Sequence, residues 1–135
     1  MERRETFSSA HRLHSPHLTD EENKRVYGKC NRASGHGHNY VWRVVLAGDV
    51  DPKTGMLYDL AALKKEMAEI LDMVDHRNID TDVPYFKEVP STSENLVRFL
   101  YEEMKKRMGR PQLLRSCILH ETEKNTFTYS EHPLE

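Results

Sequence analysis

The sequence predicts an α+β domain in which four β-strands and two α-helices follow the order ββααββ. Residues 36–47 have a strand-like pattern, residues 59–75 and 91–108 have the apolar spacing of amphipathic helices, and residues 112–121 and 124–130 have strand-like patterns again. Two helices can cover one face of a four-stranded antiparallel sheet, which leaves the other face and both edge strands open. We therefore expect neighbouring copies of the chain to cover them.

The first part of the chain predicts one more strand, followed by a long polar connection. Residues 5–13 (ETFSSAHRL) form this strand, and four of its residues would share one face: Phe7, Ser9, His11 and Leu13. Residues 14–35 are mostly polar, with a short helix expected between Thr19 and Val26, capped by Thr19 or Asp20 with Glu22 nearby. A connection of this length in a compact domain is more often functional than idle.

Capping residues and apolar spacing predict the two long helices. Asp59 is the expected cap of the first helix, and Ser91 with Glu94 has the spacing of a capping box at the start of the second. The first helix would bury Leu60, Leu63, Met67, Ile70, Leu71 and Val74, and the second would bury Leu96, Phe99, Leu100, Met104 and Met108. Residues 77–90 between them, with two prolines, are expected to be a loop.

Length and charge exclude several classes of protein. A chain of 135 residues fits a single domain spanning residues 1–135. The net charge of −2 lacks the basic excess of a nucleic-acid-binding protein. No apolar run is long enough for a membrane span, and the first residues lack the apolar core of a signal peptide, so we expect a cytoplasmic protein. Two cysteines in a reducing compartment should be free thiols.

Three of the eight histidines are placed where they can converge on a metal ion. His36 and His38 point to the same side of a predicted strand, and His11 lies on the strand before it. If the two strands pair, three imidazoles meet, a donor set that suits Zn²⁺ and leaves one coordination position open for catalysis. The alternative is that these are ordinary polar residues, the interpretation we keep for His14, His17, His120 and His132.

Cys30 lies six residues before His36 and has three interpretations. It is a fourth zinc ligand that closes a structural site, or a reactive thiolate whose pKa is lowered by Lys29, Arg32 and the metal, or a small buried residue. Its polar surroundings argue against burial in a core. Cys117, in an alternating strand, is expected to be a core residue.

Three further residues carry acid–base or recognition hypotheses. Asp75 and His76 adjoin at the end of the first long helix, where a carboxylate can orient an imidazole or the helix terminus simply favours a cationic histidine. Glu121 would share a strand face with apolar residues, where a carboxylate is costly unless paired. It either accepts two N–H groups of a planar heterocycle or lies in solvent at the strand end.

Taken together, these segments resemble the 6-pyruvoyltetrahydropterin synthase family. The resemblance covers nearly the whole chain, in the right order and spacing, and each piece alone is much less specific. It rests on FSSAHRL (7–13), LTDEEN (18–23), YGKCNRASGHGHNY (27–40), GMLYDLAALKK (55–65), VDHRNID (74–80), VPYF (83–86), STSEN (91–95) and HETEKN (120–125).

The resemblance implies the tunnelling fold, in which three ββααββ subunits close a β-barrel and two trimers stack into a hexamer. It implies one Zn²⁺ per subunit, held by the three histidines His11, His36 and His38. It implies that Cys30 is the catalytic thiol, that Asp75 and His76 are its partners in proton transfer, that Glu121 anchors the pterin ring and that Thr92 lies near the pterin pocket.

The resemblance also implies a carbon–oxygen lyase acting on phosphates. The expected reaction converts 7,8-dihydroneopterin triphosphate into 6-pyruvoyl-tetrahydropterin with loss of triphosphate, in tetrahydrobiopterin biosynthesis, with Mg²⁺ expected beside the triphosphate. Five residues separate Cys30 from His36, a longer spacer than is typical of the branch that makes 6-carboxytetrahydropterin for queuosine. That branch is one alternative, and a non-catalytic, zinc-stabilised assembly module is the other.

Overall fold

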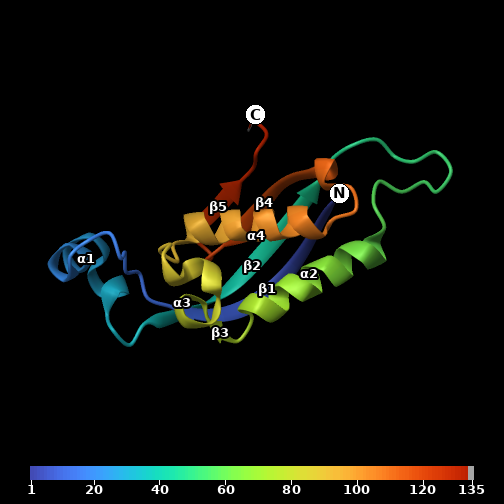
Figure 1. Ribbon diagram of the computed structural model, residues 1–135. Helices are drawn as coiled ribbons and strands as arrows, with labels where there is room; N and C mark the ends of the chain where they lie inside the picture. Colours follow the sequence, from blue (N-terminus) through green and yellow to red (C-terminus); the bar gives the residue numbers. More distant parts are fainter. Residues whose placement is uncertain (134–135) are drawn as a thin grey trace.

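The computed structural model describes residues 1–133, and its centre is a five-stranded sheet with the strand order β3-β1-β2-β4-β5 (Figure 1). Four strands pair antiparallel: β1 (Glu2–His11), β2 (His36–Leu46), β4 (Leu114–His120) and β5 (Thr126–Tyr129). The predicted class and the order of the four main strands and two long helices are confirmed.

The segment between the two long helices differs from the predicted loop. It contains β3 (Arg77–Asn78), the short helix α3 (Ile79–Asp82) and a 3-10 turn, Pro84–Lys87. The two residues of β3 pair in parallel with Ser9 and Ala10, so the sheet has a fifth strand and is not purely antiparallel. Elements this short have too few residues to show a periodic apolar pattern in the sequence. Individual contacts stabilise them: the Asn78 side chain, for example, accepts the N–H groups that begin α3.

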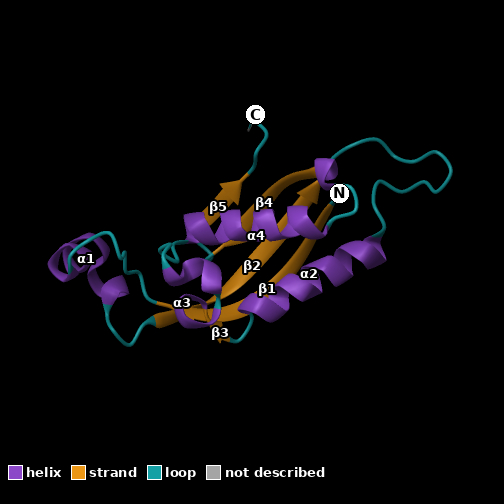
Figure 2. Ribbon diagram, in the orientation of Figure 1, coloured by secondary structure: helices purple, strands orange, loops and turns teal. Residues whose placement is uncertain are grey.

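The two long helices, α2 (Leu60–Val74) and α4 (Ser93–Arg107), lie across the same face of the sheet (Figures 1 and 2). Helix α2 packs against β1, and α4 packs against β4 and β5. Asp59 caps α2 as predicted, by accepting the N–H of Ala61 at 3.1 Å. No helix within residues 1–133 has both the length and the apolar character needed to cross a membrane.

The core lies between these helices and the sheet, and most of the predicted apolar positions are in it. All five predicted residues of α4's apolar stripe are buried. In α2 the stripe begins at Leu63, and Leu60 is 44% exposed because it is the first residue of the helix, ahead of the first turn that packs on the sheet. The predicted capping box of α4 is also wrong, since Thr92 is the cap and accepts the N–H of Asn95 at 3.3 Å.

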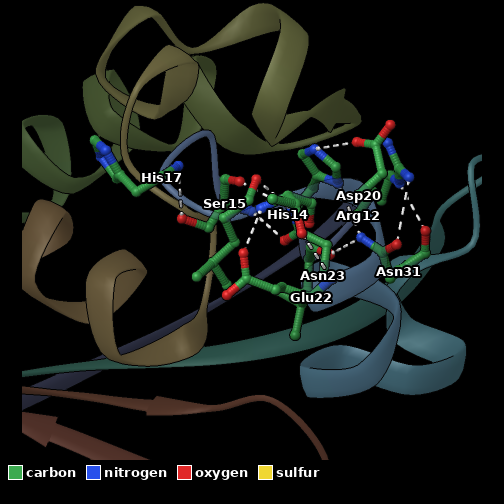
Figure 3. Close-up of polar contacts among 11 residues, drawn as sticks. Arg12, His14, Ser15, His17, Asp20, Glu22, Asn23 and Asn31 are labelled. Atoms are coloured by element: carbon green, nitrogen blue, oxygen red, sulfur yellow. Dashed lines mark hydrogen bonds and ion pairs between the residues drawn. The ribbon is translucent and has the colours of Figure 1, made fainter.

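The long polar connection carries the expected short helix, α1 (Asp20–Tyr27). Thr19, one of the two expected caps, forms a reciprocal capping box with Glu22 at its start. Asn23 is fully buried, where its side chain accepts the N–H of Ser15 at 2.7 Å and donates to the Ser15 carbonyl at 3.0 Å (Figure 3). The side-chain amide of Asn23 therefore holds the loop at Ser15 against α1 through hydrogen bonds.

Candidate active site

The pairing of β1 with β2 brings three histidines together. His11 lies opposite His36, and Ser9 lies opposite His38, so all three imidazoles project from the same face at one end of the sheet. Their ring centroids form a triangle with sides of 4.6, 5.0 and 5.2 Å. The predicted convergence of His11, His36 and His38 is confirmed.

The three imidazoles fit a metal ion. One ligand nitrogen from each ring lies within 4.8 Å of the others. His11 is only 2% exposed, and its Nε2 atom has no hydrogen-bond partner among the described residues, which is costly for a buried polar atom unless a cation uses it. Burial, more than the neighbouring imidazoles, lowers the pKa of His11 and of His38, which favours the neutral form that ligates metals.

Glycine is required at the turn that leads into His36. Gly35 has a φ of +71°, a backbone conformation that residues with a Cβ rarely adopt. A Cβ at this position would also lie 2.9 Å from the carbonyl oxygen of His11, which is too close. The absence of a side chain thus lets the loop before β2 approach the end of β1, where two of the histidines face each other.

A cavity of about 650 Å³ opens beside the histidines. The half-buried thiol of Cys30 lies in its wall, together with the side chains of Lys29 and Arg32. Other wall residues come from the same end of the sheet and from the start of α4: His11, His36, His38, Thr92, Ser93, Glu121 and Phe127. Within residues 1–133 the metal-binding group consists of the three histidines without Cys30, so the thiol is next to the cluster and not a part of it.

The backbone around Cys30 is fixed to the end of β1. The Cys30 carbonyl accepts the N–H of Leu13 at 2.9 Å, and the Asn31 side chain donates to the Leu13 carbonyl at 2.7 Å. Arg12 donates from its Nε to the Asn31 carbonyl at 2.7 Å (Figure 3). Asn31 is buried, so these bonds are shielded from water. The thiol is therefore held at a defined place relative to His11, one residue before Arg12.

Glu121 lies one residue beyond β4 and faces the histidines. Its side chain is 21% exposed, and Oε1 is 3.6 Å from Nε2 of His38. Its other oxygen accepts a hydrogen bond from the Ser93 hydroxyl at the start of α4. The Glu121 carboxylate is thus not free in solvent, and it lines the cavity with acceptor atoms available. Thr92, the α4 cap, lines the cavity beside it.

The structure does not bring Asp75 and His76 into this cavity. They directly follow α2, where the Asp75 carboxylate accepts the N–H of Ser8 at 2.9 Å and lies 3.0 Å from Nδ1 of His76. The hydrogen bond from Ser8, followed by the contact with His76, lowers the pKa of Asp75. The His76 side chain is 84% exposed at an open hollow of about 500 Å³, and its φ is +58°. The two residues contact each other but not Cys30.

Sequence reasoning did not identify several polar residues around the site. Ser93 holds Glu121, and Ser91 contacts His11 through its carbonyl oxygen. Both serines belong to the segment STSEN, where the spacing of Ser91 and Glu94 suggested a cap instead. No spacing rule connects them with residues that are 28 and 80 positions away in the chain.

The buried His11 and the half-buried His38 should make the metal-free protein sensitive to acid. Their pKa values in the folded chain are lowered from 6.5, so the unfolded chain binds more protons once the pH falls below about 6.5. The melting temperature of chelator-treated protein should therefore fall between pH 7 and pH 5. Carboxylates with lowered pKa values, such as Glu2 and Asp75, contribute only at lower pH.

Calorimetry across this range tests the expectation. His38→Gln should flatten the decline, and His132→Gln, which removes an exposed imidazole, should leave it as in the wild type. A melting temperature that stays constant from pH 7 to pH 5 would contradict the assignment.

The fold and the site define an α+β enzyme with a histidine-rich cavity. A family model described as 6-pyruvoyl tetrahydropterin synthase matches residues 1–132. The 6-pyruvoyl tetrahydrobiopterin synthase of Homo sapiens is 45% identical over 128 residues, which cover 94% of this chain and 88% of the human protein. That of Drosophila melanogaster is also 45% identical over 128 residues, covering 94% and 76%.

Solved structures agree with this. The structure of Caenorhabditis elegans 6-pyruvoyl tetrahydropterin synthase superposes with a TM-score of 0.96 at 56% identity, covering 98% of this chain and 94% of that one. An uncharacterized protein from Wolinella succinogenes, at 17% identity and a TM-score of 0.72, shares the fold. The chain belongs to the 6-pyruvoyl tetrahydropterin synthase family and is an enzyme of the lyase class.

Proposed function

We propose that this chain converts 7,8-dihydroneopterin triphosphate into 6-pyruvoyl-tetrahydropterin and triphosphate, a step of tetrahydrobiopterin biosynthesis. The observation that carries this proposal is the single cavity that gathers three imidazoles, the Cys30 thiol and the Glu121 carboxylate. The names of the human and Drosophila relatives support the pyruvoyl product over the 6-carboxytetrahydropterin of the queuosine branch.

His11, His36 and His38 would hold one Zn²⁺ per subunit. Three nitrogen donors suit this ion and leave a coordination position for the substrate. When bound, zinc would act as a Lewis acid toward the hydroxyl oxygens of the substrate side chain. The unpartnered Nε2 of His11 supports this assignment. Mg²⁺ would accompany the triphosphate, and Lys29 and Arg32 are the lysine and arginine of the cavity wall that would contact such a group.

Cys30 would remove a carbon-bound proton from the substrate side chain. Lys29 and Arg32 lie in the same cavity wall, and the loop bonds through Asn31 hold the sulfur beside the histidines. Glu121, fixed by Ser93, would accept two N–H groups of the pterin ring, with Thr92 lying alongside. No external redox cofactor is needed, because the ring gains the hydrogens that the side chain loses before triphosphate leaves.

Asp75 and His76 would complete the cavity of a neighbouring subunit in a hexamer built from two trimers. The exposure of the His76 ring and its separation from Cys30's cavity support a role in a partner's site. The aspartate would orient the imidazole for proton transfer to and from the thiol. We also propose that residues 1–135 form one domain and that the enzyme is cytoplasmic.

The decisive experiment is a product analysis with the purified protein, zinc and magnesium. Incubation with 7,8-dihydroneopterin triphosphate should release inorganic triphosphate, and mass spectrometry should find 6-pyruvoyl-tetrahydropterin. A carboxytetrahydropterin product would assign the chain to the other branch. If the protein neither releases triphosphate nor binds the pterin, the result would support a non-catalytic module.

His36→Ala should abolish stoichiometric zinc binding, because two imidazoles alone hold the ion far more weakly. Metal content after dialysis, determined by mass spectrometry, is the measurement. His120→Ala is the matched control, since that imidazole lies on β4 outside the cluster, near Arg43. Full zinc occupancy in His36→Ala would refute the ligand assignment.

A further inference from the structure

The carboxylate of Asp80 joins two segments that meet at the histidine cluster. It lies on the short helix α3, and its Oδ2 accepts the backbone N–H of Arg12 at 2.6 Å. Its Oδ1 accepts the hydroxyl of Ser91 at 2.5 Å. Arg12 directly follows the end of β1, and Ser91 lies in the segment before α4. One side chain thus links the strand that carries His11 with the loop that faces it.

Ser91 in turn fixes the orientation of His11. Its carbonyl oxygen lies 2.7 Å from Nδ1 of His11, and because a carbonyl can only accept, the proton must be on Nδ1. The Ser91 hydroxyl is 3.4 Å from the same nitrogen, but it donates to Asp80. Nε2 is therefore left with its lone pair directed at the other two imidazoles. Ser91 is fully buried, so water does not compete for these bonds.

We propose that Asp80 is a positioning residue for the metal, acting through Ser91 on His11. It touches neither the metal ligands nor the substrate cavity, and it sets the tautomer and direction of one ligand by holding the Ser91 carbonyl in place. Partners of this kind behind metal-binding histidines typically raise metal affinity about 10–100-fold. The inference rests on the proposed metal site.

Asp80→Asn is the first test. The amide keeps the shape of the side chain but removes its charge and replaces one acceptor oxygen with an N–H₂ group. Facing Arg12, this group opposes a second donor; facing Ser91, it forces the hydroxyl to turn from donor to acceptor. The dissociation constant for Zn²⁺, measured by competition with a chromophoric chelator, should rise about 10–100-fold. Asp82→Asn is the matched control. Among residues 1–133 this carboxylate on the same helix accepts from Asn78 and Thr81 alone, so the change should leave zinc affinity unchanged.

Ser91→Ala shows whether the effect passes through the serine. It removes the hydroxyl that Asp80 holds and keeps the carbonyl, so zinc affinity should fall in the same range. The double variant Asp80→Asn/Ser91→Ala should be no weaker than the weaker single variant, since both break one chain of contacts. Losses that multiply would mean that the two residues act separately and would overturn the proposal.

The remaining outcomes are distinct. A wild-type protein that binds no zinc refutes the proposed metal site itself. If Asp80→Asn binds zinc as tightly as the wild type, only the positioning role is refuted. A loss of equal size in Asp82→Asn would show general destabilisation of α3 and would also overturn the proposal. If Asp80→Asn does not fold, Ser91→Ala serves as the test. Unchanged zinc affinity in a folded Ser91→Ala would also overturn the proposal.

Discussion

Replacing Cys30 with alanine should lower kcat about 10²–10⁴-fold, the usual contribution of a positioned acid–base group, and leave the zinc content unchanged. The physical reason is that the thiol lies in the cavity wall beside the histidines but outside the cluster proposed to hold the metal. Steady-state kinetics with metal analysis on the same samples gives both values.

Cys117→Ala is the matched control for this experiment. That thiol is fully buried, and burial raises its pKa to about 12, so it is not ionised at neutral pH. Its loss should lower stability and leave kcat close to that of the wild type. Loss of zinc in Cys30→Ala would instead make Cys30 a ligand of a closed, structural site, and wild-type turnover would remove it from the mechanism.

Mixing two inactive variants should restore activity if Asp75 and His76 serve a neighbouring subunit. Cys30→Ala and His76→Asn should each be nearly inactive alone. After denaturation and refolding together in equal amounts, a site that takes Cys30 from one subunit and His76 from another is intact in about a quarter of cases, by random assembly of a symmetric oligomer. Turnover of the mixture relative to wild type is the measurement.

The same mixture discriminates against a site built within one subunit. If both residues came from the same chain, no refolded site would contain the pair, and the mixture would stay as inactive as its components. A refolded mixture of Cys30→Ala with Glu121→Gln is the matched control. Both residues line one cavity of one chain, so this mixture should give no recovery beyond that expected from its components.

The elements with a periodic pattern or a cap of their own could be predicted from the sequence. The stripe of α4 and the short helix α1 are examples, because neighbouring residues alone determine them. The cap of α4 could not be assigned in this way. Ser91 and Thr92 both suit a cap, and what decides between them is Asp80, which already holds the Ser91 hydroxyl. Such competition depends on the tertiary structure.

The residues of the candidate site also differ in whether the sequence could predict them. His11, His36 and His38 could be found because strand alternation and pairing of successive strands place them together. The sequence does not reveal that His76 lies apart from Cys30, because the position of the short segment after α2 depends on its pairing with Ser8 and Ser9. Polar partners such as Ser93 follow no periodic rule and require coordinates.

The backbone conformation of His76 carries an energetic cost for folding. A left-handed conformation costs a residue with a Cβ about 1–2 kcal/mol, whereas glycine adopts it freely. The ring is exposed and adds no burial to offset that cost. Folding alone would thus favour glycine at the place where an imidazole stands, so stability and the proposed proton transfer make opposite demands on this residue.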